Sequence, residues 1–196
     1  MDARLERAFA AIDAVNADDP NTLLVRGQTR PKEQAHAELA CEWVERLAPD
    51  APDALRVAAR AHHVQRWTIP RSEYPAGRSG YLRWRKSLQK HHGRIVREIL
   101  TDQAWPTDEI DAVVALVTKR TLGRAPDAQT LEDAICLVFV ETQLTDLSVR
   151  LDADHMVDVL RKTMKKMSAR AIELAAALPQ EEADRALISR AVASLE

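Results

Sequence analysis

The chain has 196 residues, of which 46% are hydrophobic and 30% are charged, a balance typical of one ordinary globular domain. The formal net charge of −2 provides no overall basic field, so the composition argues against extended nucleic acid and against an acidic membrane surface as partners. No stretch approaches the roughly 18 apolar residues of a membrane span, and the charged N-terminus is unlike a signal peptide. We therefore expect a cytoplasmic protein, in which Cys41 and Cys136 are reduced core thiols.

The chain contains only five glycines and shows no alternating strand pattern, which favours an all-α fold. We expect about eight to nine helices in one compact domain over residues 1–196, with core elements at about 31–151 and C-terminal helices at 153–195. In chain order the expected helices cover about 2–16, a segment opened by Pro31, about 53–63, about 79–102, a segment opened by Pro106, a buried helix containing "ICLVFV", and two or three segments within 153–195.

Residues 16–30 and 66–79 are expected to be loops, because prolines, glycines and polar residues interrupt the helical periodicity there. Thr130 and Asp133 fit a capping box, which would begin the buried helix at Thr130. The remaining interruptions, near Ser168 and Pro179, divide the C-terminal helices.

Four helices place a titratable side chain on a stripe that is otherwise apolar. His36 precedes Leu39 and Trp43 by three and seven residues, and the His62-His63 pair ends the third helix. The two other helices carry His92, which follows His91, and Asp133 on their apolar stripes. A single histidine on an apolar face is more often a core residue, but four inward titratable groups would all be satisfied by one shared cation.

We therefore predict a divalent transition metal held by His36, His63, His92 and Asp133. Imidazole and carboxylate ligands suit Zn, Mn, Fe or Ni, and the sequence does not choose among them. Glu132 is a candidate general base, and Asp133 is a candidate for catalysis as well as for metal binding. His155 lies among acidic residues and is expected at the surface.

Basic and aromatic residues alternate between residues 66 and 90. Arginine is suited to a bidentate grip on phosphate or carboxylate, and aromatic rings can stack on a base. Arg66, Arg71, Arg85 and Lys119 are therefore candidates for binding a small anionic ligand. The alternative is that Tyr81 and Trp84 anchor the helix while its basic side chains face solvent.

Several longer stretches resemble a family known only as domain of unknown function 4202. They are "EWVERLAPDA" at 42–51, "AARAHHVQRWTIPRSEYP" at 58–75, "GYLRWR" at 80–85, "TLEDAICLVFVETQL" at 130–144 and "DVLRKTMKKMS" at 158–168. Together with "PKE" at 31–33 they span almost the whole chain. The resemblance favours His63 within the first histidine pair and His92 within the second.

The order of these elements is also similar to that of the HD superfamily of metal-dependent phosphohydrolases. In that superfamily an early histidine, a His-Asp pair, later histidines and a final aspartate hold the metal, and His36, His62-His63, His92 and Asp133 occur in this order. The chain departs from the pattern where it has His-His in place of His-Asp. This departure puts the bridging carboxylate, and with it hydrolysis, in question.

Three functions remain open from the sequence. The first is an HD-like hydrolase acting on a phosphorylated or nucleotide-like small molecule, through water activated by the metal. The second is a module that binds a nucleotide or RNA without turnover. The third is an interaction protein whose inward histidines are core residues. The sequence leaves the oligomeric state open.

Overall fold

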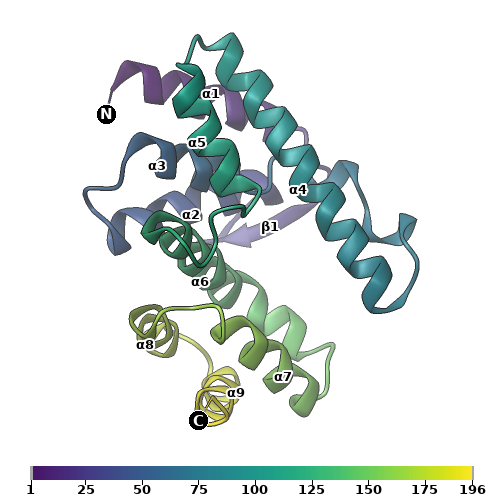
Figure 1. Ribbon diagram of the computed structural model, residues 1–196. Coiled ribbons are helices and arrows are strands. Elements are labelled where there is room, and N and C mark those ends of the chain that lie inside the picture. Colours follow the sequence, from purple (N-terminus) through teal and green to yellow (C-terminus); the bar gives the residue numbers. More distant parts are fainter. Residues whose placement is uncertain (1, 196) are drawn as a thin grey trace. The chain divides into compact units, whose positions relative to one another are not determined.

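The computed structural model describes residues 2–195, and it confirms the all-α class (Figure 1). Within these residues the helices lie close to the predicted segments. The α-helices are α1 (Ala3–Asn16), α2 (Lys32–Leu47), α3 (Asp53–Ala61), α4 (Gly77–Asp102), α5 (Thr107–Val117), α6 (Pro126–Ser148), α7 (Ala153–Met164), α8 (Ala169–Ala177) and α9 (Glu182–Ala193). None of the described helices is both long and apolar enough to cross a membrane.

The chain divides into two compact units, residues 1–131 and 132–196, with the boundary inside α6. The single domain predicted over residues 1–196 stays a prediction, and each unit is described by itself. In the first unit α3 lies against both α2 and α5, α5 packs against α4, and α1 contacts α3 and α4. The apolar face of α3 is fully buried at Leu55, Val57 and Ala58, so this short helix is the centre of the unit.

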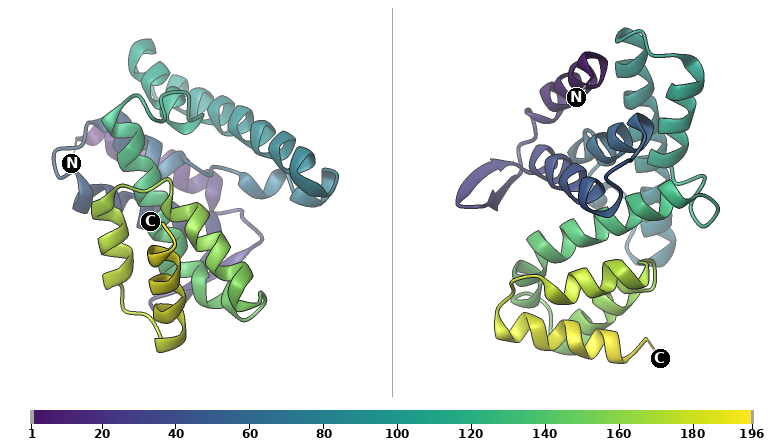
Figure 2. Two further views of the ribbon diagram at one scale, coloured as in Figure 1. Left: turned by 60° about the horizontal axis from the view of Figure 1, so that its bottom comes forward. Right: turned by 90° about the vertical axis from the view of Figure 1, so that its left-hand side faces the viewer.

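The segment predicted as a loop at 16–30 contains a β-hairpin, and the prediction was wrong there. Strands β1 (Thr22–Val25) and β2 (Gln28–Pro31) pair antiparallel. Arg26 and Gly27 both have positive φ, 51° and 77°, as a two-residue type I′ turn requires. The right-hand view of Figure 2 shows the hairpin extending away from the helices.

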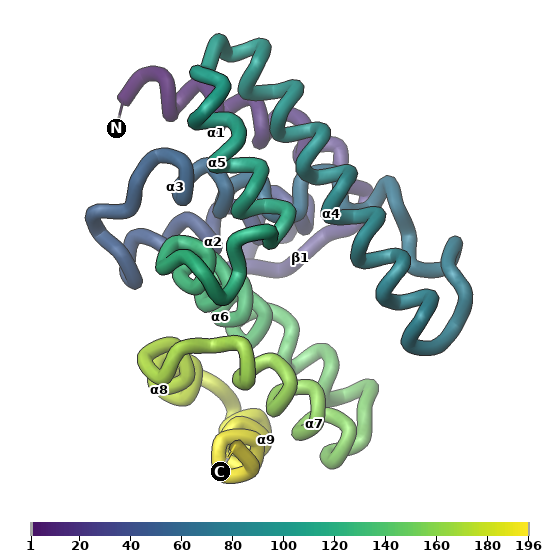
Figure 3. The backbone as a smooth tube through the Cα atoms, in the orientation of Figure 1, coloured from purple at the N-terminus to yellow at the C-terminus, as the bar shows by residue number. Residues whose placement is uncertain are grey.

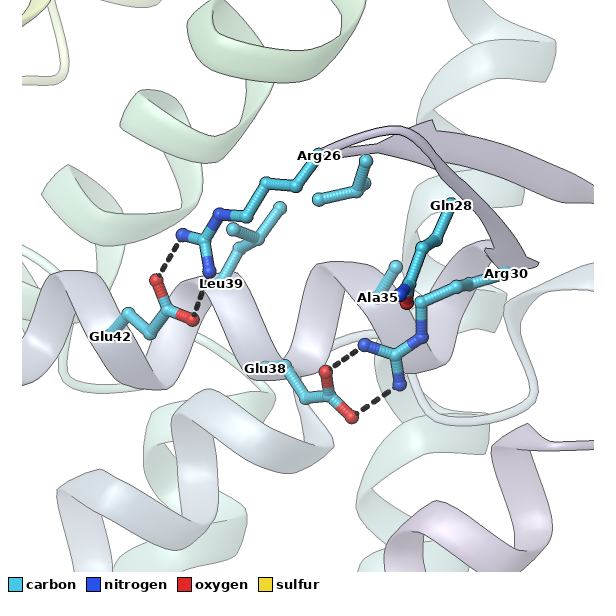
Figure 4. Close-up of a pocket in the computed structure, with 8 residues that line it drawn as sticks. Arg26, Gln28, Arg30, Ala35, Glu38, Leu39 and Glu42 are labelled. Atoms are coloured by element: carbon cyan, nitrogen blue, oxygen red, sulfur yellow. Dashed lines mark hydrogen bonds and ion pairs between the residues drawn. The ribbon is translucent and has the colours of Figure 1, made fainter.

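The hairpin is attached to α2 by ion pairs around a small pocket of about 230 Å³ (Figure 4). Arg26 makes a bidentate pair with Glu42, and Arg30 makes another with Glu38. These pairs account for both arginines of the pocket. The pocket is thus internally neutralised.

The path from α3 to α4 contains two short 3-10 turns, Arg66–Thr68 and Arg71–Glu73, in the segment predicted as a loop (Figure 3). Gln65 precedes the first turn with a left-handed backbone (φ 51°), a conformation that non-glycine residues rarely adopt. It is held by Asn16 at the end of α1, whose Oδ1 accepts a hydrogen bond of 3.1 Å from the Gln65 N–H. This turn fixes where the chain goes after the histidine pair.

In the second unit α9 packs against α7 and α8. Two hydrogen bonds attach α6 to α9 and to the α8–α9 connection: Thr145 Oγ1 donates to Asp184 Oδ2 at 2.6 Å, and Gln180 Nε2 donates to the Val140 carbonyl at 3.1 Å. Helix α6 begins at Pro126, one turn before Thr130, so the predicted capping box at Thr130 and Asp133 was wrong. The Thr130 hydroxyl instead donates to the Pro126 carbonyl inside the helix.

Candidate metal centre

The first turn of α2 presents a carboxylate and an imidazole on one face. Glu33 and His36 are three residues apart, so their side chains lie on the same side of the helix, and both are buried. The turn has no side-chain cap of its own, because Pro31 occupies the N-cap position. Asp19 replaces that cap: its Oδ2 accepts a 3.0 Å hydrogen bond from the Glu33 N–H. The negative Glu33 also suits the positive end of the helix dipole.

His63 reaches the same place from the end of α3. The helix ends at Ala61, and His62 is its C-cap. His62 Nδ1 lies 2.8 Å from the Ala59 carbonyl, which directs that imidazole back to its own helix. His63 follows outside this turn, with its ring centroid 6.4 Å from that of His36.

Glu33, His36 and His63 form a group whose donor atoms all lie within 4.8 Å of one another. Glu33 Oε2 is 3.4 Å from His36 Nδ1 and 3.3 Å from His63 Nδ1. Two ligands at about 2.1 Å from a tetrahedral metal would be separated by about 3.4 Å. Glu33 Oε2 and His63 Nδ1 are buried without a hydrogen-bond partner among the described residues. The group could therefore hold a metal ion.

The protonation states of the group agree with metal ligation. Burial opposes ionisation of Glu33, but the adjacent His63 and His36 outweigh it and hold the pKa of Glu33 well below its ordinary value. Burial also lowers the pKa of His63 well below its ordinary value, and His62 and Arg66 add to this effect. Glu33 is therefore a carboxylate at neutral pH, which is the form that binds metals.

His92 lies beside this group without being part of it. Its ring centroid is 6.0 Å from that of His63. The Val64 carbonyl lies 2.8 Å from His92 Nδ1 and accepts a hydrogen bond from the Nδ1–H, because a carbonyl can only accept. The other nitrogen, Nε2, is then an acceptor, and it is buried without a hydrogen-bond partner among residues 2–195. Burial lowers the pKa of His92 to about 3.

Arg66 is the basic residue closest to the carboxylate. Its Nε lies 4.0 Å from Glu33 Oε1, and its guanidinium stacks 4.8 Å from the centroid of the Trp84 ring. Trp84 is fixed in turn by a 2.8 Å hydrogen bond from Nε1 to the Ile69 carbonyl. A quarter of the Arg66 side chain remains exposed, so this guanidinium extends from the buried group toward solvent.

The structure places the other predicted anion ligands differently. Arg71 donates to the Tyr74 and Pro75 carbonyls at 2.7 and 2.9 Å, which stabilises its own loop. Arg85 donates to the Tyr81 hydroxyl at 3.3 Å. Lys119 follows α5 and contributes to lowering the pKa of His62, for which burial is the main cause. A substrate-binding role for these three residues stays a prediction.

Asp133 and Glu132 are buried at the start of the second unit. The Asp133 carboxylate accepts hydrogen bonds from the Ser168 N–H at 2.8 Å and from the Ser168 hydroxyl at 2.6 Å. Ser168 is the N-cap of α8, so Asp133 supports the start of that helix. Metal ligation by Asp133 and catalysis by Glu132 stay predictions.

Glu33 was not predicted as a candidate ligand, yet it is the only carboxylate in the group of three donors found among the described residues. The signal was present: Glu33 and His36 form a Glu-x-x-His pattern, and this spacing places two metal-binding side chains one turn apart on a helix. Position 33 lies in the first turn, where an acidic residue has an ordinary explanation in the helix dipole. For that reason Glu33 did not stand out as a candidate ligand.

The remaining titratable groups do not suggest another reactive centre. Burial raises the pKa of the Cys41 thiol to about 12, which makes it a poor nucleophile at neutral pH. Cys41 and Cys136 are not joined by a disulfide bond; Cys136 is buried and Cys41 is half-buried. His155 is exposed and pairs with Asp152 at the start of α7.

A model of the family described as "Domain of unknown function (DUF4202)" matches residues 6–188 of the chain. No curated protein and no solved structure matches it.

Proposed function

Because the chain belongs to the DUF4202 family, whose description gives no activity, we propose a function from its own residues: a metal-dependent hydrolase acting on a phosphorylated small molecule. The observation that carries the proposal is the buried group of Glu33, His36 and His63 with two unpartnered donor atoms. An uncompensated buried polar atom typically costs about 1–3 kcal/mol. A metal ligated by both atoms would remove that cost.

The donor set is one carboxylate oxygen and two imidazole nitrogens, which fits zinc, manganese, iron or nickel. Three protein ligands leave coordination positions for water, as in catalytic rather than structural zinc sites. A bound divalent cation supplies a water of lowered pKa and neutralises negative charge on a phosphoryl group.

The residues around the group have separate tasks. Arg66 would attract the phosphoryl oxygens, because its guanidinium reaches from the group to solvent and provides paired donors. His92 would offer Nε2, which its hydrogen bond to Val64 leaves unprotonated, as a further metal ligand. Trp84 would keep Arg66 in place through the stacking contact.

The experiment is metal analysis of untagged protein, since a histidine tag would itself bind metal. We expect near-stoichiometric metal in the wild type and its loss in His63→Ala and Glu33→Gln. His91→Ala is the matched control, because His91 neighbours His92 but is half-exposed and lies near the Thr68 hydroxyl. Metal-free wild-type protein from several metal-supplemented preparations would refute the proposal, as would equal loss in His91→Ala.

A phosphatase assay on the metal-loaded protein then separates hydrolysis from metal binding alone. Activity against a generic phosphomonoester should fall in Arg66→Ala while the metal content is unchanged. If the protein contains its full complement of metal but hydrolyses no phosphoester, the proposed hydrolase activity is refuted and only metal binding remains.

A further inference from the structure

The first unit contains a second cavity, a groove of about 570 Å³ between α4 and the end of α5. Its lining does not include Glu33, His36 or His63, which we call the metal group. We name this cavity the α4–α5 groove. Five of its nine lining residues are basic and none is acidic: Lys86, Lys90, Arg94, Arg97 and Arg120.

The α4 cations form one continuous face. Lys86, Lys90, Arg94 and Arg97 are separated by four, four and three residues, which is the spacing of neighbours on a helix surface. At about 1.5 Å per residue this face extends for about 16 Å. Arg120, which follows α5, adds a cation from the other side of the groove.

These cations are incompletely neutralised. Arg94 pairs with Glu98 and Arg97 with Asp111, and both carboxylates lie outside the groove lining. For Lys86, Lys90 and Arg120, no ion pair is found with any residue from 2 to 195. The contrast with the hairpin pocket in Figure 4 is direct, because each arginine there has its own carboxylate.

The floor of the groove is rigid and partly apolar. Gly93 of α4 lies directly against the end of α5: a Cβ at this position would be 2.7 Å from Thr118 Cγ2 and 3.5 Å from Val114 Cγ1. Glycine therefore permits a helix contact that a larger residue would push apart. Arg120, two residues after Thr118, lines the same groove as the cations of α4.

We propose that the α4–α5 groove binds a small anion that carries two or more phosphate groups. Its volume lies in the range of about 300–1,000 Å³ that is typical of small-molecule sites. Lysine and arginine provide several charge-assisted donors, which suit a polyphosphate better than a single carboxylate. The inference does not depend on the metal group, none of whose three members lines the groove.

The surrounding charges favour a small ligand over a nucleic acid strand. The basic face of α4 is followed by Glu98 and Asp102, and α5 begins with Asp108, Glu109 and Asp111. A longer polyanion would meet these carboxylates beyond the groove, whereas a ligand of nucleotide size would end before them.

The test is calorimetric titration of the full chain with inorganic tripolyphosphate and with inorganic phosphate, in the presence of EDTA so that no metal contributes. We expect saturable binding of tripolyphosphate, much weaker binding of phosphate, and an affinity that falls as salt increases. Lys90→Ala and Arg120→Ala should each weaken tripolyphosphate binding about tenfold, as expected for one lost charge-assisted contact. Thermal melts of each variant verify that folding is unchanged.

Two controls locate the binding. Arg7→Ala removes an exposed arginine of α1 that does not line the groove, and it should bind like the wild type. His63→Ala removes a metal-group histidine, and it should also retain tripolyphosphate binding. Absent tripolyphosphate binding, or equal weakening in Arg7→Ala, would overturn the proposal. Tighter binding of a single-stranded RNA oligonucleotide, lost in the same groove variants, would replace the small ligand by nucleic acid.

Discussion

Zinc should stabilise the protein against thermal unfolding, and Glu33→Gln should remove most of this stabilisation. Glu33 Oε2 lies 3.4 and 3.3 Å from the two imidazole nitrogens, so the substitution removes the central anionic donor while preserving side-chain size. At free zinc about 100 times the dissociation constant, binding stabilises the folded state by about 2.7 kcal/mol. For a chain of this length that corresponds to a rise in Tm of about 5–11 °C.

Loss of one ligand should weaken zinc binding at least as much as loss of a residue that supports a ligand, for which the affinity typically falls about 10–100-fold. A 100-fold weaker site at the same zinc concentration retains only about 0.4 kcal/mol of stabilisation, or a rise in Tm of about 1–2 °C.

The assay is thermal unfolding of untagged protein followed by circular dichroism, with zinc and with EDTA. His91→Gln is the matched control, because it removes an imidazole from α4 that lies outside the group of three donors. The EDTA samples show whether either substitution changes the metal-free fold. The assignment of Glu33 would be refuted if zinc raised the Tm of Glu33→Gln as much as that of the wild type. It would also be refuted if the rise in Tm were reduced in His91→Gln as much as in Glu33→Gln.

Two further predictions concern the supports of the group. Asp19→Ala removes the acceptor of the Glu33 N–H and should lower the free energy of unfolding by about 1 kcal/mol, as for other lost N-caps; urea unfolding with and without zinc measures this effect, and an unchanged free energy would contradict it. The depressed pKa of His92, about 3 against an ordinary 6.5, means that the unfolded chain binds a proton that the folded chain does not. Stability should therefore fall as the pH decreases from about 6.5 toward 3, and His92→Gln should reduce this slope by about 1.4 kcal/mol per pH unit. Urea titrations across this range test the sign, and an equal slope in both proteins would disprove it.

Helical periodicity was sufficient to predict most of the fold. The start of α2 near Pro31 and the end of α3 at the histidine pair were both predicted, as were the interruptions near Ser168 and Pro179. These features follow from local signals: a proline at the start of a helix, a capping serine and an apolar stripe. They do not require knowledge of which helices pack together.

The hairpin and the start of α6 could not be obtained in the same way. Each strand has only four residues, and the turn at Arg26 lacks the Asn-Gly or Asp-Gly signature of common hairpins. At Thr130 a genuine capping sequence lies inside a helix. Tertiary packing determines the structure in both cases, and local sequence propensity carries no information about that packing.

The candidate site was predicted in part. His36 and His63 were expected together from their positions on apolar faces, and the structure brings both into one group. Glu33 was missed because an acidic residue in a first helical turn is common. Arg71 shows the opposite difficulty. Its place in a basic segment suggested that it binds an anionic ligand, but it donates to carbonyls of its own loop.

The end of α1 and the segment that follows it contact the chain next to both Glu33 and His63. Asn16 accepts a hydrogen bond from the Gln65 N–H, two residues after His63, and Asp19 accepts one from the Glu33 N–H. These two buried residues, neither in the donor group, thus connect both halves of the group to the same few residues. Ordering of the donors is completed during folding, so little conformational entropy remains to be lost when an ion binds. Transfer of this group to another scaffold would therefore require three chain segments, of which one contributes no ligand.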